Sequence, residues 1–68
     1  MMYKSLGTRL KHALDIRCIS QKDFAKRIGV TECTISRYVN DERLPKADMV
    51  VVICRNLGIS SDWLLGLM

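Results

Sequence analysis

Apolar residues recur along this chain at the three- and four-residue intervals of helices that bury one face. Leu6, Leu10, Ala13 and Leu14 follow this spacing, and they predict a first helix over about residues 6–17. Similar patterns cover the rest of the chain. The sequence therefore predicts an all-α fold in which five helices form a compact bundle around one core.

Residues 21–38 carry the most informative pattern. Ser20 can cap a helix, and Asp23, three residues later, can complete a capping-box-like start. Gly29 follows where this helix ends, because glycine adopts the left-handed conformation without strain. Thr31 can then cap a second helix. The residues predicted to be buried are Phe24, Ala25 and Ile28 in the first helix, Val30 in the turn, and Ile35, Tyr38 and Val39 in the second helix.

The second of these helices leaves one face without a place in the core, formed by Glu32, Cys33, Ser36 and Arg37. Two short helices joined by a tight turn are the layout of a helix-turn-helix. In such motifs the second helix enters the major groove of DNA. The pattern therefore predicts a DNA-contacting face on residues 32–38.

The last third of the chain predicts a loop over about residues 40–45 and two further helices. Pro45 can open the fourth helix, because a first helical residue needs no amide donor. Residues 49–53, MVVVI, would also suit a strand, but their position between Pro45 and Gly58 favours one buried helix. Ser60 or Ser61 can cap the fifth helix. The residues predicted to face inward are Met49, Val52, Ile53 and Leu57 in the fourth helix, and Trp63, Leu64 and Leu67 in the fifth.

These features resemble the lambda-repressor-like family, also called the Cro-type or xenobiotic-response-element family. The resemblance covers roughly residues 5–66. The family's second helix is often followed by Asn or Glu and then Gly, whereas this chain has Asn40 and Asp41. We expect Asn40 to adopt the left-handed conformation in this turn. The matching residues are Gln21, Ala25, Gly29, Val30, Ile35, Ser36, Tyr38, Arg43, Pro45 and the ending LGISSDWLLG at 57–66.

The resemblance implies a regulator of transcription, most simply a repressor, that binds specific sequences of double-stranded DNA. Glu32, Cys33 and Arg37 are the candidates for base contacts, with Ser36 as a secondary candidate. Arg37 could equally bind a phosphate, and Glu32 could equally serve the dipole of its helix. The resemblance places Gln21 on a phosphate. Further phosphate candidates are Thr34, Asn40, Arg43 and Lys46.

Composition and charge narrow the class of protein. The chain has 68 residues with a net charge of +4, which allows one domain over residues 1–68. Its apolar runs are too short to span a membrane, and its first residues lack a signal-peptide pattern, so we expect a cytoplasmic protein. Positive charge alone fits solvated helices as well as a polyanionic partner. The positions of the basic residues are more informative than the net charge. They cluster in the motif and just after it, at Lys22, Lys26, Arg27, Arg37, Arg43 and Lys46.

Catalytic and metal chemistry find little support in the sequence. The three cysteines and His12 lack the spacing of a zinc site, and no pair of acidic residues or glycine-rich loop indicates an active site. We therefore expect no enzyme activity, cofactor, metal or small-molecule ligand. Cys18 and Cys54 are predicted to be core residues, and His12 a solvated one. Cys33 is interpreted as a small contact residue, with an oxidation-sensitive switch as the alternative.

Assembly is predicted from the end of the chain. One recognition helix covers half a site, and the common solution is a two-fold dimer on a palindromic operator. Leu67 and Met68 lie beyond Gly66, where the core is running out, and are predicted to form the interface of a homodimer. Two alternatives remain open at this point. The chain could be a protein-interaction module with the same fold, or the DNA-binding subunit of an antitoxin or restriction-controller system.

Overall fold

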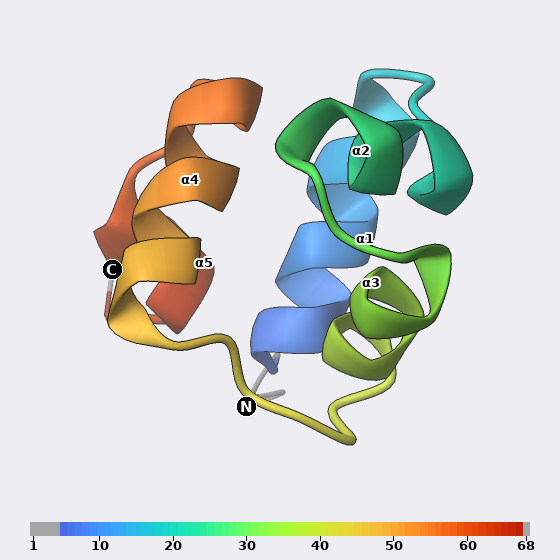
Figure 1. Ribbon diagram of the computed structural model, residues 1–68. Coiled ribbons are helices and arrows are strands. Elements are labelled where there is room, and N and C mark those ends of the chain that lie inside the picture. The colour runs from blue at the N-terminus through green and yellow to red at the C-terminus, as the bar shows by residue number, and fades with distance from the viewer. Residues whose placement is uncertain (1–4, 68) are drawn as a thin grey trace.

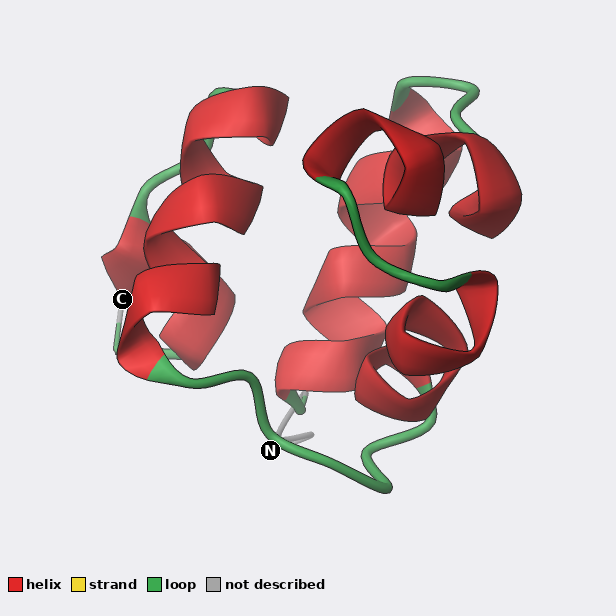
Figure 2. Ribbon diagram, in the orientation of Figure 1, coloured by secondary structure: helices red, strands yellow, loops and turns green. Residues whose placement is uncertain are grey.

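The computed structural model describes residues 5–67, and all the regular structure in this range is helical (Figures 1 and 2). The predicted all-α architecture of five helices is confirmed. None of these helices is both long and apolar enough to cross a membrane. The helices are α1 (Leu6–Ile16), α2 (Gln21–Ile28), α3 (Glu32–Val39), α4 (Ala47–Leu57) and α5 (Ser61–Leu65).

Every helix contributes to one core. In Figure 1, α4 and α5 lie on one side of the molecule and α2 and α3 on the other, with α1 between them. Accordingly, α1 packs against both α3 and α5. Burying each large aliphatic or aromatic side chain of the core stabilises the fold by about 1.5–3 kcal/mol. The largest fully buried side chains are Leu10, Leu14, Phe24, Ile35, Ile53 and Leu64.

Side-chain caps fix where most of the helices begin. The hydroxyl oxygens of Ser20, Thr31 and Ser60 each accept a hydrogen bond from the amide three residues later, at 3.0–3.2 Å. Ser5 does the same for α1. The sequence predicted the caps of α2 and α3, and of the two serines that it offered for α5 the cap is Ser60. Each cap is worth about 1 kcal/mol, because it satisfies an amide that has no partner inside its helix.

A left-handed residue ends each of the five helices in the described range. At three of these positions the residue is glycine: Gly29, Gly58 and Gly66. The other two are Cys18, with φ 55°, and Asp41, with φ 59°. The expectation that Asn40 would be left-handed was therefore wrong, since Asn40 has φ −88° and closes the last turn of α3.

Several predicted positions are corrected by the structure. α1 ends at Ile16, so Cys18 lies in the following turn and is exposed rather than buried in the core. Pro45 does not open α4, because Lys46 is the N-cap and the helix begins at Ala47. Within α4, Val50 is buried, while Met49 and Val52 are only half-buried. The 49–53 run is helical, as favoured.

The predicted burial of α5 was also partly wrong. Leu64 is fully buried, but Trp63 is only half-buried. Leu67 lies outside the helix and is 71% exposed, because α5 ends at Leu65 and Gly66 reverses the chain. Met68 lies outside the described residues.

Candidate nucleic-acid interface

The turn between α2 and α3 is built by short-range contacts. Gly29 adopts φ 77°, and the amide of Val30 then donates to the carbonyl oxygen of Ala25 at 2.9 Å. This pair of features is the Schellman ending of a helix. Val30 packs against the core from the turn. The side chain of Ala25 is small and buried, which suits the packing of α2 against α3.

α3 buries one side and exposes the other. Ile35, Tyr38 and Val39 are in the core, as predicted. Glu32, Cys33 and Arg37 are exposed on the opposite side. These three residues are spaced by one and four positions, so the helix brings them onto one face. The side chain of Arg37 makes no hydrogen bond or ion pair with any other residue in the range 5–67.

Two further α3 residues are occupied within the helix. Ser36 is half-buried, and its hydroxyl oxygen accepts a hydrogen bond from the side-chain amide of Asn40 at 3.3 Å. The hydroxyl of Thr34 lies 2.9 Å from that of Thr31, the N-cap. Thr34 and Ser36 are thus less available to a ligand than Glu32, Cys33 and Arg37.

The remaining predicted contacts lie at two other places. Gln21 is the first residue of α2 and is half-buried. Asn40, Arg43 and Lys46 are exposed on the loop that leaves α3. Arg43 and Lys46 come together beside Tyr38, where they line a small hollow of about 190 Å³. The loop therefore presents positive charge next to the C-terminal end of α3.

The basic side chains of this surface form no ion pairs within the described part of the chain. Residues 5–67 contain one ion pair, between Lys11 and Asp15 on α1, in which Nζ lies 3.2 Å from Oδ2. The side chains of Arg37, Arg43 and Lys46 are left without acidic partners. Uncompensated cations beside an exposed helix face suit a polyanion. No group of His, Cys, Asp and Glu in the described part of the chain could hold a metal ion.

Asp41 has a role that sequence reasoning missed. Its carboxylate accepts hydrogen bonds from the hydroxyl of Ser5 at 2.6 Å and from the amide of Gly7 at 3.0 Å. A side chain that follows α3 thus caps the first turn of α1. The only signal for this role in the sequence was that Asp41 stands where the family often has glycine.

Of the large apolar residues that are exposed in the described range, Leu44 lies in the loop after α3, Ile16 lies on α1, and the other three lie on α4, on α5 and just after it. Val51 and Leu65 line a hollow between α4 and α5, together with Pro45. Leu67 follows two residues beyond Leu65 and is also exposed. We call Val51, Leu65 and Leu67 the α4–α5 apolar surface. Sequence reasoning identified only Leu67 of these three.

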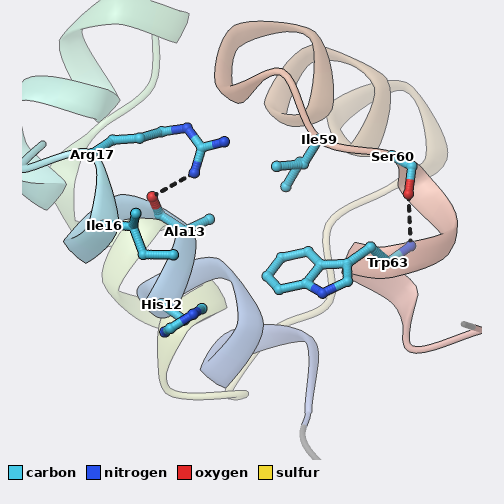
Figure 3. Close-up of a pocket in the computed structure, with 7 residues that line it drawn as sticks. All are labelled: His12, Ala13, Ile16, Arg17, Ile59, Ser60 and Trp63. Atoms are coloured by element: carbon cyan, nitrogen blue, oxygen red, sulfur yellow. Dashed lines mark hydrogen bonds between the residues drawn. The ribbon is translucent and has the colours of Figure 1, made fainter.

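A third hollow, of about 450 Å³, lies between α1 and α5 and contains none of the predicted contact residues (Figure 3). Ile16, Ile59 and Trp63 supply most of its apolar lining. Arg17 turns back to donate a hydrogen bond to the carbonyl oxygen of Ala13 at 3.0 Å. His12 is exposed at its edge, as expected for a solvated residue. In Figure 3 the hollow opens on the side of α1 away from α3.

The fold and its exposed helix define a class of protein, the helix-turn-helix proteins of the lambda-repressor-like type. A family model described as helix-turn-helix matches residues 13–64. The chain belongs to this family.

Individual relatives agree with the family. The chain is 34% identical over 62 residues to the HTH-type transcriptional regulator ImmR of Bacillus subtilis (strain 168), a match that covers 91% of the chain and 49% of ImmR. The chain thus spans about half the length of this curated relative.

Two solved structures of the P22 c2 repressor have the same fold. One is a crystal structure in complex with a synthetic operator, with a TM-score of 0.86 and 26% identity over 91% of this chain and 94% of that chain. The other is a solution structure of the DNA-binding domain of that repressor, with a TM-score of 0.86 and 25% identity over 94% and 84% of the two chains.

Proposed function

We propose that this protein binds specific sequences of double-stranded DNA and represses transcription from them. The observation that carries the proposal is the exposed face of α3, where Glu32, Cys33 and Arg37 lie on a helix whose other side is fixed in the core. Such a helix is narrow enough to enter a major groove, and its buried side holds its orientation. This activity would take place in the cytoplasm, where we expect the protein to act.

Base recognition falls to the exposed residues of α3. Arg37 can make a bidentate pair with the O6 and N7 atoms of guanine, and Glu32 can accept a hydrogen bond from N4 of cytosine. Cys33 is small and only weakly polar, which suits contact with an apolar base edge. Ser36 is a secondary contact, since its hydroxyl is already hydrogen-bonded to Asn40.

Phosphate contacts would surround this helix. Arg43 and Lys46 are exposed after the end of α3 and make no ion pair with any of residues 5–67, and Asn40 begins the same loop. Gln21 and Thr34 lie in the first turns of α2 and α3, where backbone amides point outward and favour an anion. These contacts would fix the orientation of the protein on the duplex without selecting a sequence.

The α4–α5 apolar surface supports a two-fold dimer on DNA. Leu67 is exposed although its amide is fixed by a hydrogen bond to the carbonyl oxygen of Asp62 at 2.8 Å. An apolar side chain held in this way is stabilised when a second copy covers it. We propose that Val51 and Leu65 join Leu67 in this contact, and that Met68 extends it.

The size of the molecule is compatible with this arrangement. Half-sites of a palindrome lie about 34 Å apart, which puts each recognition helix about 17 Å from the two-fold axis. The molecule measures 34 × 24 × 21 Å. Because α3 and α4 lie on opposite sides in Figure 1, a contact through α4 and α5 would keep the α3 helix of each copy away from the two-fold axis.

Selection of bound duplexes from a random DNA pool tests the proposal. We expect an enriched palindromic motif. Binding to it should weaken about a thousand-fold or more between 50 and 200 mM salt if the dimer makes about 6–10 phosphate contacts. Failure to enrich any motif, together with no binding at low salt, would instead favour a protein-interaction module on the same fold.

A further inference from the structure

Asp41 occupies a position at which three of the other four helices have glycine. Its φ of 59° is left-handed, a conformation that is strained for a residue with a Cβ atom. Strained residues persist where the surrounding structure uses them. The strain at Asp41 therefore directs attention to what its side chain does.

The side chain of Asp41 joins two segments that are far apart in sequence. One carboxylate oxygen accepts from the Ser5 hydroxyl at 2.6 Å, and the other accepts from the Gly7 amide at 3.0 Å. α1 has no acidic residue of its own in its first turn. Asp41 supplies that negative charge from the turn after α3, where it satisfies an amide and complements the dipole of α1.

The backbones of α1 and α3 are in close contact at Gly7. A Cβ atom on Gly7 would collide with the carbonyl oxygens of Tyr38 and Val39, at the end of α3. The first turn of α1 therefore lies directly against the last turn of α3. Close packing and two hydrogen bonds act at the same place, so the end of α3 is held against α1.

We infer that Asp41 is a positioning residue for DNA binding, an inference that rests on the proposed function. By tying the end of α3 to α1, Asp41 sets the position of the loop that starts at Asn40 and carries Arg43. The loop is then ordered before the protein binds DNA, so less conformational entropy is lost when its side chains contact phosphates.

Charge and positioning predict opposite effects for the loss of this carboxylate. Asp41 lies in the same turn as the phosphate candidates, so removing its negative charge alone should strengthen binding to a polyanion. If Asp41 positions the loop, its removal should weaken binding in spite of the gained charge. The sign of the change therefore separates the two effects.

Three variants make the test. Asp41→Gly removes the carboxylate and also relieves the left-handed strain, so the thermal stability should stay close to that of the wild type. Its affinity for the selected duplex should nevertheless fall about ten-fold. The slope of log K against log salt should become shallower by about one phosphate contact, which a merely structural role would not change.

Asp41→Asn is the conservative variant. Asparagine tolerates the left-handed conformation and can accept from Gly7 while donating to Ser5. We expect it to bind at least as tightly as the wild type and to keep the full salt slope. Cys18→Gly is the matched control, because it relieves the same strain at an exposed helix end without a tether, and it should leave DNA binding unchanged.

Amide hydrogen exchange at Gly7 gives a readout that needs no DNA, and exchange in Asp41→Gly should be at least ten-fold faster than in the wild type. The inference is overturned if Asp41→Gly binds with wild-type affinity and slope, or if Asp41→Asn loses as much affinity as Asp41→Gly. A wild-type protein that binds no duplex would contradict the proposed function. Unchanged Gly7 exchange would then still refute the tether.

Discussion

At the scale of single residues, the surroundings of each side chain decide its chemistry. The three cysteines illustrate this, since Cys18 and Cys33 are exposed whereas Cys54 lies in the core. Burial raises the pKa of the Cys54 thiol, because the charged thiolate is poorly solvated there. Cys54 therefore remains a neutral thiol under conditions in which an exposed cysteine begins to ionise.

Thiol labelling of the native protein should follow this division. We expect Cys18 and Cys33 to react first, and Cys54 to lag by about a hundred-fold or more because it must wait for unfolding. Mass spectrometry of the labelled protein locates each modification. Denaturant should make all three react alike, and early labelling of Cys54 in native protein would contradict its burial.

Arg37 and Arg43 can be separated by their effect on sequence preference. Arg37→Ala should cost about 1–3 kcal/mol of binding and relax the preference at one base pair, if Arg37 contacts a base. Arg43→Ala is the matched variant, and it should weaken binding to all sequences alike. Site selection with both variants measures the difference. An equal loss on every duplex for Arg37→Ala would assign it to a phosphate.

At the scale of the helices, the caps and turns control how the elements end and meet. Most of these signals lie within a few residues of each other, and for that reason the sequence predicted the caps Ser20 and Thr31. Gly29 and Gly7 show the difference between local and long-range constraints. Gly29 is needed for its own backbone conformation, whereas Gly7 is needed for a neighbour that lies more than thirty residues away.

Alanine substitutions at the two glycines should therefore differ. Gly29→Ala should cost about 1 kcal/mol from the left-handed strain alone, because a Cβ atom there meets nothing within 4 Å. Gly7→Ala should cost about 2 kcal/mol or more, because the backbone of α3 must move. Denaturant unfolding of both variants measures these losses. Equal losses would mean that the contact of α1 with α3 is looser than described.

At the scale of the whole molecule, the protein has two surfaces of different chemistry. The exposed face of α3 and the following loop carry basic side chains that form no ion pair with any of residues 5–67, and the α4–α5 apolar surface lies on the side of the molecule away from α3 (Figure 1). A dimer through the second surface would place two copies of the first along one duplex. Each half-site alone would then bind weakly.

Leu67→Lys tests this assembly. We expect the fold to persist, because Leu67 is 71% exposed, and affinity for a full palindrome to fall far more than affinity for a half-site. Ile16→Lys is the matched control, since Ile16 is 62% exposed on α1 and outside the proposed interface. Sedimentation and binding to both duplexes decide the matter. Unchanged palindrome affinity for Leu67→Lys would place the dimer contact elsewhere.

The sequence by itself determined the helices, most of their caps and the exposed face of α3. These depend on spacing within one or two turns, where apolar periodicity and capping residues act directly on the local backbone. The sequence predicted the ends of helices less accurately, since Cys18 lies beyond the end of α1 and Pro45 does not open α4. A shift of one or two residues at a helix end moves the residues there out of the helical periodicity, and a pattern that assumes this periodicity then misplaces them.

Only the tertiary structure decided which distant segments meet. The link from Asp41 to Ser5 and Gly7 has no local pattern, because its geometry exists only after α1 and α3 have packed. The α4–α5 apolar surface likewise depends on the packing of two helices. Val50 and Val51 are the same type of residue, yet Val50 is buried and Val51 is exposed. Burial depends on what lies opposite a residue, and a linear pattern records only what lies beside it.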